Sequence, residues 1–193
     1  METNSQALAS ALLIMDIQPA TVGMMGDQAP ALIAPLKTAI AAARKASIPV
    51  IYVVVGFRKG FPELGDNMQN LSFGQLKKAG YPGLEDPTVD PSMGALPGEI
   101  VVTKRRVSAF AGSDLEVILR GLRIDHLVLT GIATSGVVLS TLREASDKDY
   151  RISVLSDACA DRDSEVHNVL MGKVFPRQAE VMTTADWVAG LGK

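Results

Sequence analysis

The sequence predicts an α/β fold: three layers (αβα), with helices on both faces of a six-stranded, mainly parallel, Rossmann-like sheet. Short apolar runs alternate with amphipathic helical stretches almost throughout the chain, which is typical of parallel strands joined by helical crossovers. The hydrophobic content of 47% and the mean hydropathy of +0.20 are high, as expected when both faces of a sheet are buried. The length of 193 residues suits a single domain with a full core.

The first part of the chain predicts two buried strands with a helix between them. Residues 1–8 are polar, and we expect a disordered tail there. Residues 11–16 (ALLIMD) and 49–55 (PVIYVVV) are apolar or β-branched runs of strand length, and Pro19 helps to stop the first of them. Residues 30–46 have apolar residues at helical spacing, with a proline where a first-turn proline belongs.

Residues 56–97 differ from the rest of the chain. They contain many glycines and prolines, and only the stretch near 72–79 has a weak helical pattern. A connection of this length inside one domain is usually functional or disordered. We therefore expect a region that covers the substrate.

The second half predicts four more strands, each followed by a helix. The third strand is followed at once by Lys104, and the helix after it has a capping-box pattern, Ser113-x-x-Glu116. Asp163 or Ser164 is the expected N-cap of a later helix. The predicted strands are 99–103, 126–130, 151–155 and 179–182, and the predicted helices are 113–122, 135–148, 163–172 and a short one around Trp187.

The charge, the apolar runs and the cysteine count exclude several classes of protein. The net charge is −2 and no lysine- or arginine-rich stripe is present, so nothing indicates nucleic-acid binding. No apolar run has the length of a membrane span, and the N-terminus lacks a signal-peptide pattern. The single cysteine, Cys159, excludes an intrachain disulfide, and we expect a cytoplasmic location.

Three polar features are expected at the carboxyl ends of strands, where ligands bind in sheets of this kind. They are Asp16, Lys104 and the small-residue turn 131–136 (GIATSG), which leads into a helix. A carboxylate, an amine and a group of exposed backbone N–H donors would together form a plausible catalytic geometry. The alternatives are a solvated strand end for Asp16, a basic run with Arg105 and Arg106 for Lys104, and an ordinary helix start for the turn.

The stretches LLIMDIQ, VVTKRRVSAF and LVLTGIATSGVV resemble, in order and spacing, three motifs of the isochorismatase-like hydrolase superfamily. The resemblance covers roughly residues 11–187. It implies a small-molecule substrate, a homo-oligomer (dimer or tetramer), and a site built from Asp16, Lys104 and the turn. It further implies a cis peptide bond between Ile132 and Ala133, and an anion-binding nest formed by the backbone N–H groups of Ala133 and Val137.

The chain departs from the cysteine members of that superfamily at the nucleophile. Their cysteine is the sixth residue after the motif's glycine, and counting from Gly131 gives Val137. A valine cannot attack a carbonyl carbon, so the thioester route is closed. Isochorismatases also lack this cysteine, and the resemblance implies that they cleave a vinyl ether by protonation and water attack.

A catalytic metal is not expected. Nicotinamidases in the superfamily carry a D-x-H pair just after the second strand, where this chain has Val55-Gly56-Phe57-Arg58. Its two histidines, His126 and His167, fall at a strand start and in a late helix. We therefore predict no metal and no other cofactor.

The resemblance gives Asp16 the role of general acid or base. Lys104 would hold it, favour its ionised form and bind developing negative charge. Five further residues are candidates for substrate binding, of which Arg58 could pair with a substrate carboxylate. Ser135 is also the only hydroxyl near the turn that could replace the nucleophile, whereas Cys159, flanked by alanines, is expected to be a packing residue. The five candidates are Gln18, Phe57, Arg58, Phe110 and Ser135.

Two functions follow from these residues. The first is a cysteine-less, metal-free hydrolase that works through Asp16 and Lys104, with an isochorismate-type vinyl ether as one candidate substrate. The second is a non-catalytic small-molecule-binding or assembly protein that has lost the nucleophile. The charged pair favours the first function, and Val137 favours the second.

Overall fold

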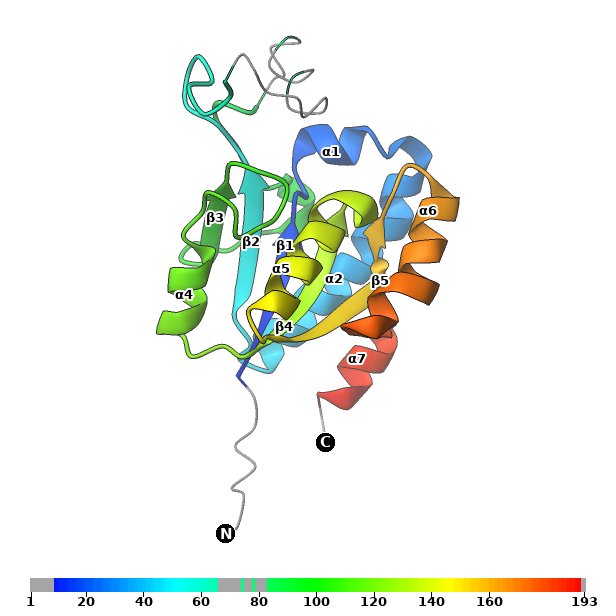
Figure 1. Ribbon diagram of the computed structural model, residues 1–193. Helices are drawn as coiled ribbons and strands as arrows, with labels where there is room; N and C mark the ends of the chain where they lie inside the picture. Colours follow the sequence, from blue (N-terminus) through cyan, green and yellow to red (C-terminus); the bar gives the residue numbers. More distant parts are fainter. Residues whose placement is uncertain (1–8, 66–73, 75–77, 79–82, 192–193) are drawn as a thin grey trace.

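The computed structural model describes residues 9–65, 74, 78 and 83–191. Six strands form one parallel sheet in the order β3-β2-β1-β4-β5-β6 (Figure 1). This confirms the predicted three-layer α/β fold. The strands are β1 (Ser10–Met15), β2 (Val50–Val55), β3 (Ile100–Lys104), β4 (His126–Ile132), β5 (Arg151–Ala160) and β6 (Glu180–Met182).

Helices cover both faces of the sheet (Figure 1). Helices α4, α5 and the α6–η4 segment pack on one face, and α2 and α7 pack on the other. The α-helices are α1 (Pro19–Gly23), α2 (Ala29–Lys45), α4 (Leu115–Gly121), α5 (Leu139–Asp147), α6 (Ser164–Val169) and α7 (Thr184–Gly190). The short 3-10 and π turns are η1 (Gly26–Gln28), η2 (Pro91–Met93), η3 (Thr134–Val138), η4 (Leu170–Val174) and η5 (Phe175–Arg177).

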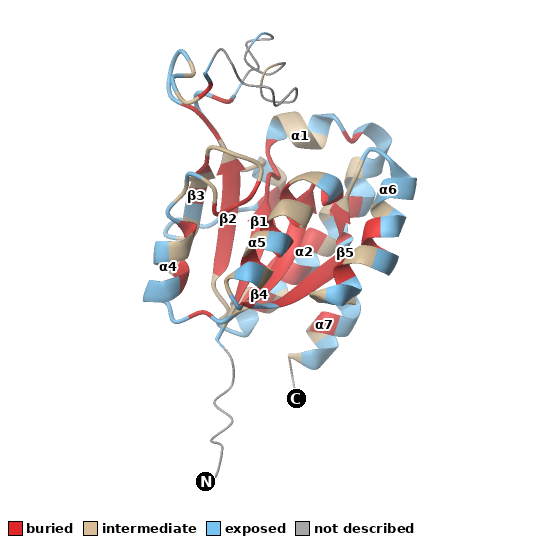
Figure 2. Cartoon of the chain, in the orientation of Figure 1, coloured by how far each residue is buried: buried red, intermediate tan, exposed pale blue. Residues whose placement is uncertain are grey.

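The strand β1 shows why the sheet is buried on both sides. Its side chains alternate between the two faces, so Leu13 and Met15 pack toward α4 and α5, while Leu12 and Ile14 pack toward α2. All four are fully buried, and the sheet forms the buried centre of the molecule (Figure 2). A strand surrounded in this way must be apolar throughout, which explains the run ALLIM.

Several elements differ from the prediction. Pro19 is the first residue of α1, a helix that the sequence analysis missed, because proline's fixed φ suits a helix start. The strand β5 continues to Ala160, five residues beyond the predicted end, so Cys159 lies inside a strand. The capping box is absent: Ser113 Oγ accepts a hydrogen bond from the Leu115 N–H at 3.2 Å, and the helix begins only at Leu115.

The predicted tail at 1–8 and most of the weak helical stretch 72–79 lie outside the described residues. Among those that are described in the long connection, Phe57, Leu64 and Leu84 form a small buried cluster of their own. No helix in the described part of the chain is long and apolar enough to cross a membrane.

Candidate active site

The candidate site lies where the strand order reverses. From the centre of the sheet, β1, β2 and β3 follow one another toward one edge, and β4, β5 and β6 follow one another toward the other edge. The switch point therefore lies between the neighbouring strands β1 and β4. Connections leave in opposite directions there, which opens a crevice at the carboxyl ends of the strands. Asp16 directly follows β1, and the cis peptide bond between Ile132 and Ala133 lies at the end of β4.

Asp16 is held by its backbone as the strand ends. Its φ of +55° is left-handed, a region that aspartate and asparagine tolerate better than most residues, and this turn terminates β1. Its N–H donates to the Val53 carbonyl at 2.8 Å, and its own carbonyl accepts a hydrogen bond from the Thr21 hydroxyl. The residue is 8% exposed. The carboxyl group therefore sits in a fixed and largely buried position.

Lys104 reaches Asp16 from two strands away. The strand β2 lies between β3 and β1, a separation of about 9–10 Å, which only a long side chain can span. Lys104 Nζ lies 3.0 Å from Asp16 Oδ2 and donates hydrogen bonds to the carbonyls of Arg106 and Val107 at 2.9 and 3.0 Å. These three acceptors match the three N–H donors of an ammonium group. Lys104 thus positions Asp16, and this geometry leaves it no free donor for negative charge on a substrate.

Burial controls the chemistry of Asp16 more than Lys104 does. Desolvation raises the pKa of the Asp16 carboxyl, and the charge and hydrogen bond of Lys104 offset only part of that rise. Lys104 does favour the ionised form of Asp16, as expected, but burial has the larger effect and sets the net direction of the pKa shift. Asp16 Oδ1 is buried and has no hydrogen-bond partner among the described residues. A carboxyl with a raised pKa and one free oxygen is suited to donating a proton.

The end of β4 approaches the end of β1 very closely. Gly131 has φ of +140°, and a Cβ atom there would lie 2.2 Å from the Met15 carbonyl oxygen. Only glycine fits this position, which lies beside the residue before Asp16. The peptide bond between Ile132 and Ala133 is cis, as the resemblance implies, and the η3 segment begins at Thr134.

Two contacts that the sequence analysis missed hold the turn against β5 and α6. Asp161 Oδ2 accepts hydrogen bonds from the Ser135 N–H at 2.7 Å and from the Ser135 hydroxyl at 2.6 Å. The Thr134 hydroxyl lies 2.8 Å from His167 Nδ1. No sequence pattern indicates that residues so far apart in the chain are in contact. The only available signal is that Asp161 directly follows the end of β5, where residues of functional sites are often found.

Val137, which the motif count places at the nucleophile position, and the single cysteine are both buried. Val137 is 2% exposed and packs in the same core cluster as Met15. Cys159 is buried in β5 beside Gly131, and burial raises the pKa of its thiol to about 12. A thiol of this kind is protonated at neutral pH and cannot act as a nucleophile. Its packing role agrees with the prediction.

The other four candidates for substrate contact have their polar groups or rings engaged elsewhere. The Gln18 amide pairs with the backbone of Val55 through both its Oε1 and its Nε2, at 2.9 and 3.2 Å. Arg58 forms an ion pair with Glu63 at 2.7 Å. Phe57 is 3% exposed in its small cluster, and Phe110 stacks on Tyr150 at a ring distance of 6.0 Å.

Arg105 and Arg106 tie the long connection to the end of β3. Arg105 donates to the Gly56 carbonyl at 2.7 Å, and Arg106 donates to the Glu63 carbonyl at 2.9 Å. The basic run after Lys104 is therefore structural rather than solvated. Within the described part of the chain, no three His, Cys, Asp or Glu side chains lie together as a metal-binding group.

A buried acid held by an amine at the switch point of a parallel sheet is a geometry suited to acid–base chemistry on a small molecule. The chain matches the Isochorismatase domain family over residues 10–186 and belongs to this family of hydrolases. It is 31% identical over 179 residues to the uncharacterized isochorismatase family protein YwoC of Bacillus subtilis, covering 93% of this chain and 92% of the relative.

Two further relatives give the family a known reaction and a known structure. The chain is 34% identical over 191 residues to the ureidoacrylate amidohydrolase RutB of Variovorax paradoxus, covering 83% of this chain and 74% of that one. It superposes with a TM-score of 0.83 on an isochorismatase family protein from Burkholderia thailandensis, with 30% identity and 96% of each chain covered. Both the fold and the family membership predicted from the three motifs are therefore confirmed.

Proposed function

We propose that the chain is a hydrolase that cleaves a small molecule by acid–base chemistry at Asp16, without a covalent intermediate. One observation carries the proposal: the buried Asp16 has a raised pKa, and Oδ1 faces no partner among the described residues while Oδ2 is held by Lys104. Placing an unpaired carboxyl oxygen in a buried site is unfavourable unless a ligand completes it. A carboxyl with a raised pKa keeps its proton at higher pH than an exposed aspartate does, so it has a proton to donate to a substrate.

The absence of a nucleophile supports a non-covalent route. Val137 occupies the position that the cysteine holds in other members of the superfamily, and it is buried among apolar side chains. Cys159 is too deeply buried and too weakly acidic to replace it. The Ser135 hydroxyl donates to a carboxylate, Asp161, which is a poor base for activating an alcohol.

An isochorismate-type vinyl ether fits this chemistry. Asp16 Oδ1 transfers its proton to the terminal carbon of the C=C bond, whose electron pair forms the new C–H bond and leaves an oxocarbenium ion. Water adds to the cationic carbon and returns a proton to the Asp16 carboxylate. The hemiketal then breaks its C–O bond to release an alcohol and a ketone, and the acid is regenerated. Backbone N–H groups of Ala133 and Val137 bind the carboxylate of the substrate.

The second candidate is a protein that binds such a molecule without cleaving it. The buried, apolar side chain of Val137 favours this alternative, since the commonest reaction of the family has no nucleophile here. It does not account for Asp16 and Lys104, because a pocket that only binds does not need an acid with a free oxygen. We therefore prefer the hydrolase.

The test is turnover of isochorismate, nicotinamide and ureido or carbamoyl amides by the wild-type chain and by Asp16→Asn. Asparagine also tolerates a left-handed φ, so the fold should be retained. We expect vinyl ether hydrolysis that falls about 10²–10⁴-fold in Asp16→Asn. Asp27→Asn, at an exposed aspartate, is the matched control and should keep full activity. Activity that survives in Asp16→Asn would refute the mechanism, and binding without turnover in wild type would favour the second candidate.

Val137→Cys tests the same site by placing a cysteine at the predicted nucleophile position. If the remaining machinery is that of the cysteine members, this variant should gain amide hydrolysis. The proposed reaction needs no metal or other cofactor, because the D-x-H pair of nicotinamidases is absent from the sequence. Homo-oligomerisation, as a dimer or tetramer, and a cytoplasmic location remain predictions.

A further inference from the structure

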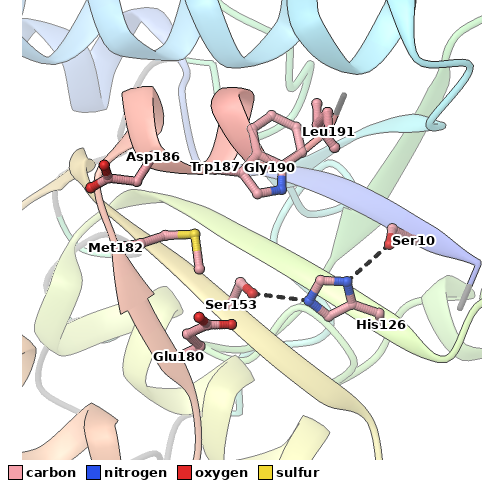
Figure 3. Close-up of a pocket in the computed structure, with 9 residues that line it drawn as sticks. All are labelled: Ser10, His126, Ser153, Glu180, Met182, Asp186, Trp187, Gly190 and Leu191. Atoms are coloured by element: carbon pink, nitrogen blue, oxygen red, sulfur yellow. Dashed lines mark hydrogen bonds between the residues drawn. The ribbon is translucent and has the colours of Figure 1, made fainter. Parts of the chain in front are cut away.

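A second pocket lies at the opposite end of the sheet from Asp16. Ser10 and His126 are the first residues of β1 and β4, whereas Asp16 follows the last residue of β1. A six-residue strand separates the two ends by about 20 Å, so the pocket is distinct from the candidate active site. Its volume is about 550 Å³, within the usual range of small-molecule sites. The lining residues are Ser10, His126, Ser153, Glu180, Met182, Asp186, Trp187, Gly190 and Leu191 (Figure 3).

The floor of this pocket is polar but carries no fixed positive charge. The His126 ring lies between two hydroxyls, with Nδ1 2.9 Å from Ser10 Oγ and Nε2 3.0 Å from Ser153 Oγ (Figure 3). Burial and the nearby charge of Arg151 lower the pKa of His126, although Asp125 and Glu180 act in the opposite direction. The imidazole is therefore neutral at physiological pH and does not neutralise the acids of the pocket.

The walls combine apolar surface with two carboxylates. The Trp187 indole is 7% exposed, and it lies with Met182 and Leu191 along the pocket (Figure 3). Glu180 and Asp186 are exposed at the pocket, and no lysine or arginine among the described residues forms an ion pair with either. Asp186 Oδ2 accepts a hydrogen bond from the Thr183 hydroxyl at 2.7 Å, which fixes the orientation of its carboxylate.

We propose that this pocket binds a small organic cation, namely a primary ammonium or guanidinium group on a short apolar body. Two carboxylates without an ion pair among the described residues, beside a floor that contains no cation, attract a cation and repel an anion; Arg151 is not among the lining residues. The indole, thioether and leucine surfaces accommodate the carbon body, which a bare metal ion does not have. An indole beside the cationic group adds a cation–π attraction.

Trp187 makes the proposal directly measurable, because it is the only tryptophan in the chain. Benzylamine is the probe, and benzyl alcohol and benzoate are neutral and anionic comparators of similar shape. We expect tryptophan fluorescence to change saturably with benzylamine, with at least tenfold weaker binding of benzyl alcohol and benzoate. Equal affinity for the amine and the alcohol, or no saturable change with the amine, would overturn the proposal.

The double variant Glu180→Gln/Asp186→Asn removes both charges and keeps the side-chain shapes. It should weaken benzylamine binding at least tenfold. The control Glu165→Gln/Asp147→Asn makes the same charge change at exposed positions on α6 and α5 and should alter affinity less than twofold. If the double variant does not fold, Glu180→Gln alone should weaken binding at least threefold. Unchanged affinity in the folded pocket variant would refute the assignment. The assignment would also be refuted if benzylamine changed the fluorescence only by dissociating an oligomer, because the pocket would then be occupied by a second copy of the chain.

Discussion

Replacing Gly131 with alanine tests whether the close approach of β4 to β1 determines the position of Asp16. The added Cβ atom would lie 2.2 Å from the Met15 carbonyl oxygen and 3.0 Å from the Met15 carbonyl carbon. Both are backbone atoms in the middle of the sheet, so no side-chain rotation can relieve the clash. The strands must separate, and Met15 directly precedes the candidate catalytic acid.

The size of the effect follows from two terms. A non-glycine residue held at φ of +140° costs about 1–3 kcal/mol in backbone strain. Overpacking in a well-packed core adds about 1–3 kcal/mol. The sum, about 2–6 kcal/mol, is a large part of the 5–15 kcal/mol that is typical of a domain. With an m-value of about 2–3 kcal/mol/M, the urea midpoint should fall by about 0.7–3 M.

The assay is urea unfolding followed by circular dichroism and Trp187 fluorescence. Gly172→Ala is the control, because its Cβ would meet no atom within 4 Å and it lies in a helical segment. That variant should be as stable as wild type or more stable by up to about 1 kcal/mol. A Gly131→Ala protein that loses less than about 1 kcal/mol would refute the packing argument. It would show that the two strands can separate at that point without strain.

Two more predictions concern the buried ionisable groups. Lys104→Met should raise the pKa of Asp16 further, because it removes the group that partly offsets desolvation, and a ¹³C NMR titration of the Asp16 carboxyl measures this. A folded-state pKa above the unfolded value of 3.8 lowers stability as pH rises through the folded-state pKa, so this variant should be more destabilised relative to wild type at pH 7 than at pH 4. An Asp16 pKa that stays unchanged or falls would contradict the assigned cause. Cys159 should react with a thiol reagent at pH 8 only in urea, given its pKa of about 12, and rapid labelling of the native protein would contradict its burial.

The strands and helices were predictable where one physical signal dominates. The run ALLIM must be a strand buried on both faces, and the helix 30–46 has apolar residues at a spacing that no strand shares. The failures occur where local and tertiary signals compete. Pro19 was predicted to stop the preceding strand, but the fixed φ of proline also suits the start of a helix, and α1 begins there. The polar Ser156 and Asp157 read as the end of β5, but the strand continues past them because their side chains bond to β6 and α7.

The Asp16–Lys104 pair was predictable because both residues end parallel strands of one sheet. The strand order places them two strands apart at the same edge, and the length of the lysine side chain brings its Nζ to 3.0 Å from Asp16 Oδ2. Contacts that depend on three-dimensional packing were not predictable. Gln18 follows Asp16 and looks like a ligand-binding amide, but it bonds to the Val55 backbone instead. Asp161 gave no signal, although it accepts both hydrogen bonds that hold Ser135.

The sign of the Asp16 pKa shift bears directly on the proposed reaction. A thiol route would need Asp16 as a base, and a base works best when its proton is held weakly. In this chain, burial outweighs the stabilising charge of Lys104, so the carboxyl retains its proton more strongly than an exposed aspartate does. Val137 packs in the same apolar core cluster as Met15, the residue before this acid. The burial of Asp16 therefore favours protonation of a substrate over attack on it, which agrees with the proposal that Val137 replaces the nucleophile.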